Sequence, residues 1–133
     1  MPVINGSPFV MTDCTLSVLT DDFAKLVSKI ELVPEPVLAE FVGGKPDAVF
    51  QLVGATKWTL NLSFAQDWAS STSLSNYLFN NIGQQKVFVF EPISGGKSVT
   101  VTVVIVPGSI GGDINAIAQS TVALKVIGQP VIA

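Results

Sequence analysis

The chain has 133 residues, of which 48% are apolar and only 13% are charged. This length fits one domain with a single core, and the charged fraction is about half of the roughly 25% that is usual for soluble domains. Much of the surface is therefore expected to meet another protein. The alternative interpretation is a well-packed β protein coated with Ser, Thr, Asn and Gln.

The formal net charge is −3, with seven Lys, no Arg and no His. Proteins that read DNA meet phosphates and base edges with Arg and Lys, so specific DNA binding is not expected. The lack of His removes the commonest general base and the commonest metal ligand. We therefore predict no catalytic residues, no metal site and no cofactor.

Cys14 is the only cysteine, which excludes an intrachain disulfide, and we interpret it as a small buried hydrophobe. The first ten residues lack a basic segment followed by an apolar run. The longest apolar run, Val103–Pro107, is far shorter than the about 18 residues of a membrane helix. We expect a protein that is made in a cytoplasm and does not associate with a membrane.

The first third of the chain alternates with a period of two, which is typical of strands. One strand is predicted over Val10–Leu19 and a second over Phe23–Val33, with Thr20-Asp21-Asp22 as the turn between them. The apolar faces are Val10, Cys14, Leu16 and Val18 in the first strand, and Ala24, Leu26, Ile30 and Leu32 in the second. We predict that the two strands form a hairpin with one buried face.

A long loop is predicted over about residues 34–56, because prolines and glycines interrupt the pattern there. A strand at Ala48–Val53 is an alternative for part of it. A connection of this length is uncommon in a compact domain unless it is functional. The candidate surface for contact with another subunit comprises Val37, Leu38, Phe41, Val42, Gly43, Gly44, Val49 and Phe50. We expect Gly43-Gly44 to bend the tip of this segment.

The middle of the chain predicts one strand and one helix. In Lys57–Phe64, Trp58, Leu60, Leu62 and Phe64 alternate with polar residues. The helix is predicted within Ser73–Ile82, with Leu74, Tyr77, Leu78 and Ile82 as its packing face. A Ser or Thr among residues 70–73 can cap its start, and Gly83 can end it in a left-handed conformation.

Three closing strands are predicted over Lys86–Pro92, Ser98–Val106 and Gln119–Ile127, with Ser94–Lys97 as a hairpin turn between the first two. The predicted fold class is mainly β: an antiparallel sandwich or partly closed barrel with one flanking α-helix. We expect a single domain over residues 1–133, with an N-terminal arm of about residues 1–8.

Two short segments resemble ligand-binding motifs but lack residues that those motifs require. Gly96-Lys97-Ser98 resembles the end of a phosphate-binding loop, but the required earlier glycine is Glu91 and a strand follows instead of a helix. Asp113-Ile114-Asn115 resembles the start of a calcium loop, but no glutamate closes it at the required distance.

The order of segments resembles the tail tube proteins of long-tailed bacteriophages, especially those of actinobacteria. Phe50–Trp68 is similar to the central strand of that family, Ser73–Gly83 to its helix and Lys86–Pro92 to its next strand. Val106–Asp113 and Thr121–Pro130 resemble its final turn and strand. The resemblance covers roughly residues 48–130 and rests on an ordered set of patterns, without a catalytic signature.

The resemblance implies a structural virion protein that assembles with copies of itself. Family members close into six-membered rings, which stack into a tube through which the genome is ejected. The implied location is the virion tail, and the implied partners are the tape measure, tail terminator and distal tail proteins. Genomic DNA would pass through the tube without specific binding.

Two other functions stay open. The first is another phage ring protein, such as a tail terminator or a connector, which makes one ring and stops. The second is a monomeric β-sandwich that binds a ligand, for which Trp68 is the one loose aromatic candidate.

Overall fold

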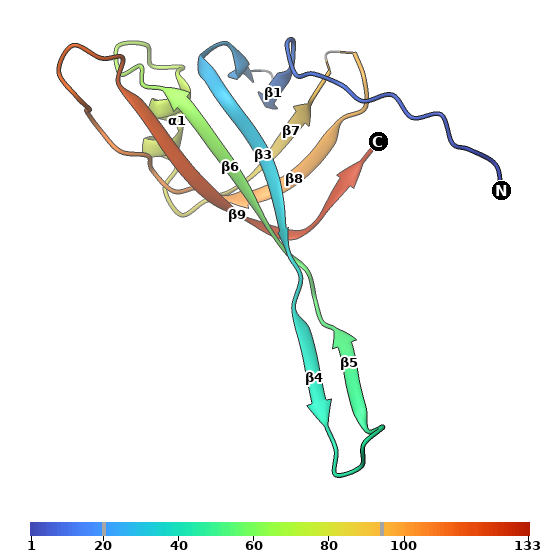
Figure 1. The fold of residues 1–133 in the computed structure, drawn as a ribbon. Coiled ribbons are helices and arrows are strands. Elements are labelled where there is room, and N and C mark those ends of the chain that lie inside the picture. The colour runs from blue at the N-terminus through green and yellow to red at the C-terminus, as the bar shows by residue number, and fades with distance from the viewer. Residues whose placement is uncertain (20, 94) are drawn as a thin grey trace.

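The computed structural model describes residues 1–19, 21–93 and 95–133, and it shows an antiparallel seven-stranded sheet curled into a half-barrel (Figure 1). The strand order is β2-β1-β7-β8-β9-β6-β3. The strands are β1 Thr15–Val18, β2 Asp21–Asp22, β3 Val27–Glu35, β6 Lys57–Ala65, β7 Gln85–Glu91, β8 Val99–Val104 and β9 Gln119–Ile132. The predicted class, mainly β with a partly closed barrel and one helix, is confirmed.

The core lies on the concave side of this half-barrel. It is built from the alternate positions of each strand, as the period of two requires. Its side chains are Leu16, Val18, Phe23, Ile30, Leu60, Leu62, Phe64, Leu74, Leu78, Phe88, Phe90, Val101, Val103, Ile105, Val122 and Leu124. Each large side chain buried there contributes about 1.5–3 kcal/mol. Val10 and Leu26, which were predicted on the apolar faces of the first two strands, are exposed and lie outside the core.

The helix α1, Leu74–Asn80, closes one side of the core. Ser73 caps its start by accepting a hydrogen bond from the backbone N–H of Asn76, as the sequence predicted. Leu74 and Leu78 are buried, and Tyr77 packs against the core. Ile82 lies beyond the end of the helix and is 53% exposed, so its placement on the packing face was wrong.

The predicted hairpin between residues 10–19 and 23–33 is also wrong. β1 pairs with β2 and β7, whereas β3 pairs with β6 at the other edge of the sheet. The Asp22 carboxylate accepts hydrogen bonds from the N–H groups of Leu16 (3.2 Å) and Ala24 (3.0 Å), and a 3-10 turn follows at Ala24–Leu26. These local bonds redirect the chain across the barrel opening. Thr20 of the predicted turn lies outside the described residues.

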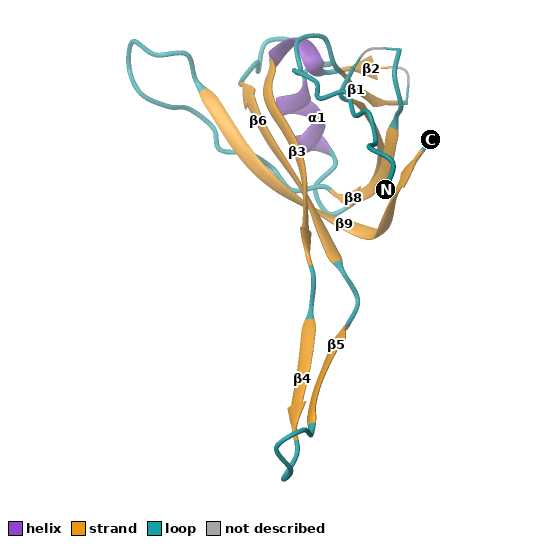
Figure 2. Cartoon of the chain, turned by 45° about the vertical axis from the view of Figure 1, so that its right-hand side comes forward, coloured by secondary structure: helices purple, strands orange, loops and turns teal. Residues whose placement is uncertain are grey.

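Residues 34–56 form strands instead of a loop. β4, Leu38–Val42, pairs with β5, Val49–Val53, which matches the alternative of a strand at 48–53. β-branched and aromatic residues oppose one another along the ladder, and such pairs stabilise sheets. The turn is held by hydrogen bonds from Gly43 N to Ala48 O (2.6 Å) and from Ala48 N to Lys45 O (3.1 Å). This hairpin continues β3 and β6 and projects well away from the half-barrel (Figure 2).

The closing strands match the prediction with two differences. β7 and β8 pair as a hairpin, with Gly95 at φ +81°, although Ser94 of the predicted turn lies outside the described residues. β9 runs on to Ile132, beyond the predicted end, and pairs first with β6 and then with β8. Gly128, at φ +78°, lies in the second half of β9, which bends away from β6 and pairs with β8 (Figure 1).

Candidate assembly surfaces

The projecting hairpin β4–β5 presents two apolar faces. Residues directly opposite each other in an antiparallel pair share a face, and successive residues alternate. The register therefore defines an aromatic face of Ala39, Phe41, Phe50 and Leu52. It also defines an aliphatic face of Leu38, Val42, Val49 and Val53, crossed by a hydrogen bond from Gln51 Nε2 to Glu40 Oε2 (3.1 Å).

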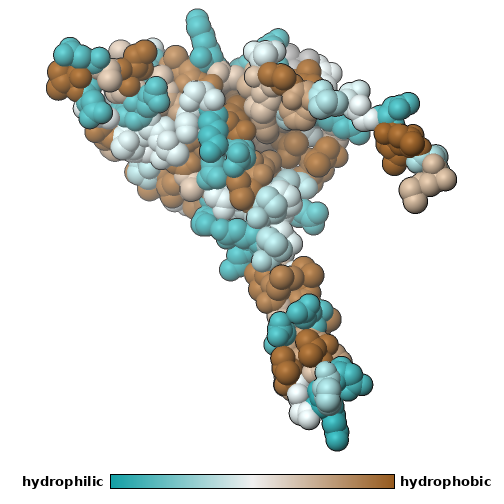
Figure 3. Space-filling view, in the orientation of Figure 1, coloured by the Kyte–Doolittle hydropathy of each residue, from teal (hydrophilic) through white to brown (hydrophobic). Residues whose placement is uncertain are grey.

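Both faces are open to solvent. Leu52 is 70% exposed and Phe41 is 66% exposed on the aromatic face, and Leu38 is 72% exposed on the aliphatic face. Figure 3 shows apolar residues along most of the arm. Leaving such side chains in water forgoes about 1.5–3 kcal/mol for each one that could be buried. A single flat partner would cover only one face, so full burial of the hairpin requires a groove or two neighbours.

The structure brings the sequence-predicted contact residues together on this hairpin. Val37 precedes β4, Leu38, Phe41 and Val42 lie on β4, and Val49 and Phe50 lie on β5. Gly43 and Gly44 lie in the turn, where a Cβ on Gly43 would come within 2.8 Å of the Ala48 Cβ. Sequence reasoning missed Leu52 and Val53, although the alternation within residues 49–53 was the signal that could have found them.

A second exposed apolar set lies in the connection between β8 and β9. This isoleucine loop, residues 106–118, exposes Ile110 (68%), Ile114 (89%) and Ile117 (77%). Asp113 is the only charged residue within it. The loop lies at the end of the molecule opposite the hairpin tip (Figures 1 and 2).

Gln66, just after β6, fixes the isoleucine loop. Its side-chain Nε2 donates to the carbonyl oxygens of Gly111 (2.9 Å) and Gln119 (3.0 Å), and its Oε1 accepts from the Gly111 N–H (2.9 Å). Its backbone N–H donates to Ala118 O (2.9 Å). These bonds tie Gly111 and the C-terminal end of the loop to the segment after β6, and Ile114 and Ile117 lie between the two tied positions.

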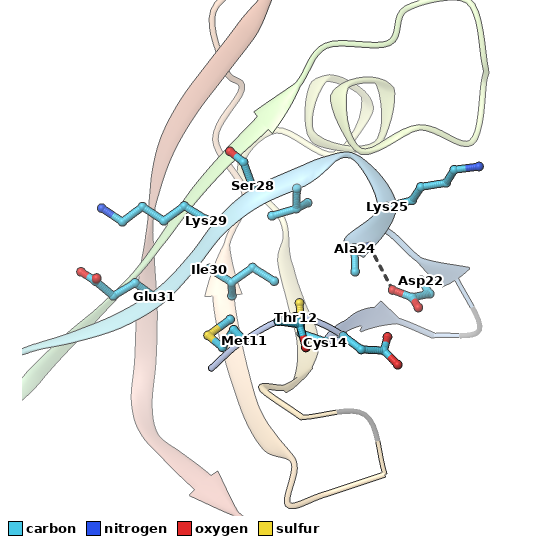
Figure 4. A pocket seen from close by; sticks show the side chains of 12 residues that line it. Met11, Thr12, Cys14, Asp22, Ala24, Lys25, Ser28, Lys29, Ile30 and Glu31 are labelled. Atoms are coloured by element: carbon cyan, nitrogen blue, oxygen red, sulfur yellow. Dashed lines mark hydrogen bonds between the residues drawn. The ribbon is translucent and has the colours of Figure 1, made fainter. Parts of the chain in front are cut away.

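A groove of about 710 Å³ marks the opening of the half-barrel, between β3 and the segment Met11–Cys14 (Figure 4). Its polar lining includes Asp22, whose carboxylate already holds the turn, and Lys25 and Lys29, which point away from the opening. Cys14 lines it without a histidine anywhere in the chain to activate the thiol.

The carboxylate of Asp67 has a structural role. Hydrogen bonds from Ser70, and to a lesser extent from Ala69, lower the pKa of Asp67, because they favour the charged carboxylate. That carboxylate shapes the turn before α1. Within residues 1–19, 21–93 and 95–133, no three His, Cys, Asp or Glu side chains gather in a group that could hold a metal ion.

Trp68 does not form a flat binding platform. The centroids of the Trp68 and Phe79 rings are 6.2 Å apart, and the rings are nearly perpendicular. The Trp68 indole N–H donates a hydrogen bond to Gln66 Oε1 (3.0 Å). Trp68 is 37% exposed. The described part of the chain also holds no helix with the length and apolar character that crossing a membrane requires.

Comparison with known proteins rests on fold alone. No protein-family model and no curated protein sequence matches the chain. Among solved structures, it is similar to a chain of the "Virion of native gene transfer agent (GTA) particle", with a TM-score of 0.70, 12% identity, and coverage of 95% of this chain and 99% of that one. At that identity the likeness establishes a shared fold.

Two further structures share this fold. One is a chain in the "Tail of empty GTA particle", refined with C6 symmetry, with a TM-score of 0.62, 12% identity, and coverage of 81% of this chain and 82% of that one. The other is a chain in an extracellular contractile injection system described as "PVC sheath/tube terminator in extended state". It has a TM-score of 0.66, 15% identity, and coverage of 96% of this chain and 98% of that one. The chain thus has the fold of subunits found in tail-like particles.

Proposed function

We propose that this chain is a non-enzymatic structural subunit of a phage-tail-like particle, in which copies close into six-membered rings and the rings stack into a tube. The observation that carries the proposal is the fold likeness over nearly the whole length of both chains to a subunit of a gene transfer agent particle. The C6 symmetry of the GTA tail that contains a chain of the same fold supports the ring number.

The uncovered hairpin supports the assembly part of the proposal. A ring needs one contact that closes by rotation, and a stack of rings needs a second contact along the axis. The hairpin extends in one direction with both apolar faces exposed. It is therefore suited to the axial contact, and Val37, Leu38, Phe41, Val42, Gly43, Gly44, Val49 and Phe50 are its proposed contact residues.

A tail terminator is the second candidate, and the likeness to a chain in the sheath/tube terminator structure favours it. A terminator makes one ring and stops, whereas a tube subunit polymerises. In either role the partners would be other copies and neighbouring tail proteins, and genomic DNA would pass through the ring without specific binding.

Negative-stain electron microscopy of the purified protein, over a range of protein and salt concentrations, tests the proposal. We expect hollow tubes of variable length that show rings in end view. Single rings that never lengthen would support the terminator instead. A protein that stays monomeric by light scattering at the highest attainable concentration would overturn both roles and favour the monomeric binding module.

A further inference from the structure

We propose that the isoleucine loop, residues 106–118, is the surface that receives the hairpin β4–β5 of another copy of this chain. The inference rests on the proposed function and deepens it, because it names the acceptor of the axial contact. The contact would pair the aromatic face of the hairpin with Ile110, Ile114 and Ile117. Both apolar sets are uncovered, and they lie at opposite ends of the molecule.

The placement of the two sets fits a head-to-tail contact. The hairpin leaves the half-barrel at the end where β3 stops and β6 starts, and the isoleucine loop lies at the other end, beside the start of β9 (Figures 1 and 2). Figure 3 shows apolar atoms at both of these places. When copies are translated along the direction of the arm, the tip of one approaches the loop end of the next. Such a contact joins two different patches and can repeat without limit.

Neither set is covered within its own chain. Phe50 is 58% exposed on the hairpin and Ile114 is 89% exposed on the loop. Specific interfaces bury about 800 Å² on each partner, and aromatic side chains bury about 150–250 Å² each. Phe41, Phe50 and Leu52 of the aromatic face would therefore supply a substantial part of the area that such a contact needs.

The loop is built to receive a partner with little loss of freedom. The Gln66 side chain makes three hydrogen bonds that hold Gly111 and Gln119, all of 2.9–3.0 Å. The Ser109 and Ser120 hydroxyls are also within hydrogen-bond distance (3.0 Å). A surface that is already ordered loses less conformational entropy on binding. Ile114 and Ile117 thus lie on a segment that is anchored at Gly111 and Ala118 and has only one charge, Asp113.

Cysteine cross-linking of the full chain tests this contact. In a Cys14→Ser background, one preparation carries Phe50→Cys and a second carries Ile114→Cys, and the two are mixed under assembly conditions and oxidised. We expect a covalent dimer only in the mixture. The control mixture contains Phe50→Cys and Ile93→Cys in place of Phe50→Cys and Ile114→Cys. Ile93 is also exposed (49%) but lies just beyond the end of β7.

A second measurement uses Ile114→Ser with Ile117→Ser, compared with the single control Ile93→Ser. We expect the double variant to keep the wild-type circular dichroism and to need at least about tenfold more protein before tubes form, which corresponds to about 1.4 kcal/mol. The control should assemble at the wild-type concentration.

The outcomes separate this inference from the proposed function. Tubes that form without the Phe50–Ile114 product, or with equal amounts of the Phe50–Ile93 product, overturn the acceptor and leave the tube subunit standing. The same holds when the double variant assembles like the wild type. Failure of the wild-type chain itself to assemble under any condition overturns the proposed function and the acceptor together.

Discussion

At the residue scale, Tyr77 carries the one polar atom that the core does not accommodate. Its hydroxyl is buried without a hydrogen-bond partner among the described residues, and its ring lies between those of Phe23 and Phe88. An unpaired buried hydroxyl costs about 1–3 kcal/mol. We therefore expect Tyr77→Phe to leave stability unchanged or to raise it by up to that amount, measured by urea denaturation at neutral pH. A clear loss of stability would reveal a partner for the hydroxyl.

The same residue predicts a dependence on alkaline pH. Burial, followed by the negative charge of Asp21, raises the pKa of Tyr77 above its usual value. A raised pKa in the folded state means that this contribution to stability is present below the unfolded pKa of about 10 and is lost as pH rises through the folded pKa. The wild type should therefore lose more stability above about pH 10 than Tyr77→Phe does. Parallel pH profiles of the two proteins would contradict this.

Two neighbouring apolar residues test where the packing face of α1 ends. Leu78 is fully buried, so Leu78→Ala should lower the free energy of unfolding by about 2–5 kcal/mol, because it leaves a cavity. Ile82 is half-exposed beyond the helix, so Ile82→Ala should stay within about 0.5 kcal/mol of the wild type. Thermal melting measures both. Equal losses would return Ile82 to the packing face that the sequence predicted.

At the element scale, the hairpin β4–β5 is separable from the half-barrel. Val37 and Gly54 meet at its base through a hydrogen bond from Gly54 N to Val37 O (2.5 Å), and the core includes no residue from 38 to 53. Replacing residues 38–53 with a two-residue Asn-Gly turn should therefore preserve the fold and its melting temperature. It should abolish stacking while allowing single rings. Circular dichroism and electron microscopy give the two readouts.

The control for that variant changes only the turn charges, Lys45→Ser with Asp47→Ser, and keeps both apolar faces. It should form tubes of ordinary length. If the shortened chain also forms such tubes, the hairpin is not the axial contact. If it does not fold, the hairpin supports the barrel in a way that its lack of buried residues does not show.

At the scale of the whole molecule, the charge balance predicts how the proposed assembly should respond to salt and to DNA. Six copies of a chain with a charge of −3 would give a ring of about −18, which repels phosphates and neighbouring rings alike. At 0.1 M, salt largely screens this repulsion between charges that are more than about 10 Å apart, whereas apolar contacts do not depend on that repulsion. We therefore expect tubes to form at lower protein concentration as salt is raised, measured by light scattering. Dissociation of tubes by moderate salt would indicate that ion pairs hold them.

The same charge predicts no affinity for duplex DNA. The chain has no Arg, and its seven Lys are spread along the sequence without a basic run. A gel shift at physiological salt should show no complex with monomers or with tubes. A complex that added salt removes would reveal a positive patch formed on assembly.

The sequence correctly predicted the strands and the helix that are determined by a hydrophobic pattern within their own residues. Strict alternation identified β6, β7, β8 and the first half of β9, since one face of each strand is buried and the other is not. The stripe in α1 and its Ser73 cap are similarly local. The sparsely charged composition of the chain and the apolar content of residues 34–56 predicted a candidate contact surface there.

Pairing partners and exposure were decided by the tertiary structure. Leu16 and Val18 of β1 and Ile30 of β3 are buried as predicted, whereas Val10 precedes β1, Leu26 lies in the 3-10 turn, and both are exposed. Hydrogen bonds to Asp22 turn the chain between β1 and β3, which lie toward opposite edges of one sheet. β4 and β5 pair with each other because no other strand lies beside them. The two apolar faces of the hairpin depend on the register between these strands, which the alternation within β4 alone does not give. The isoleucine loop is anchored at Gly111 by Gln66, which lies 45 positions earlier in the chain. A sequence pattern records which side chains favour burial, whereas contacts between distant segments determine which of them the folded chain leaves exposed.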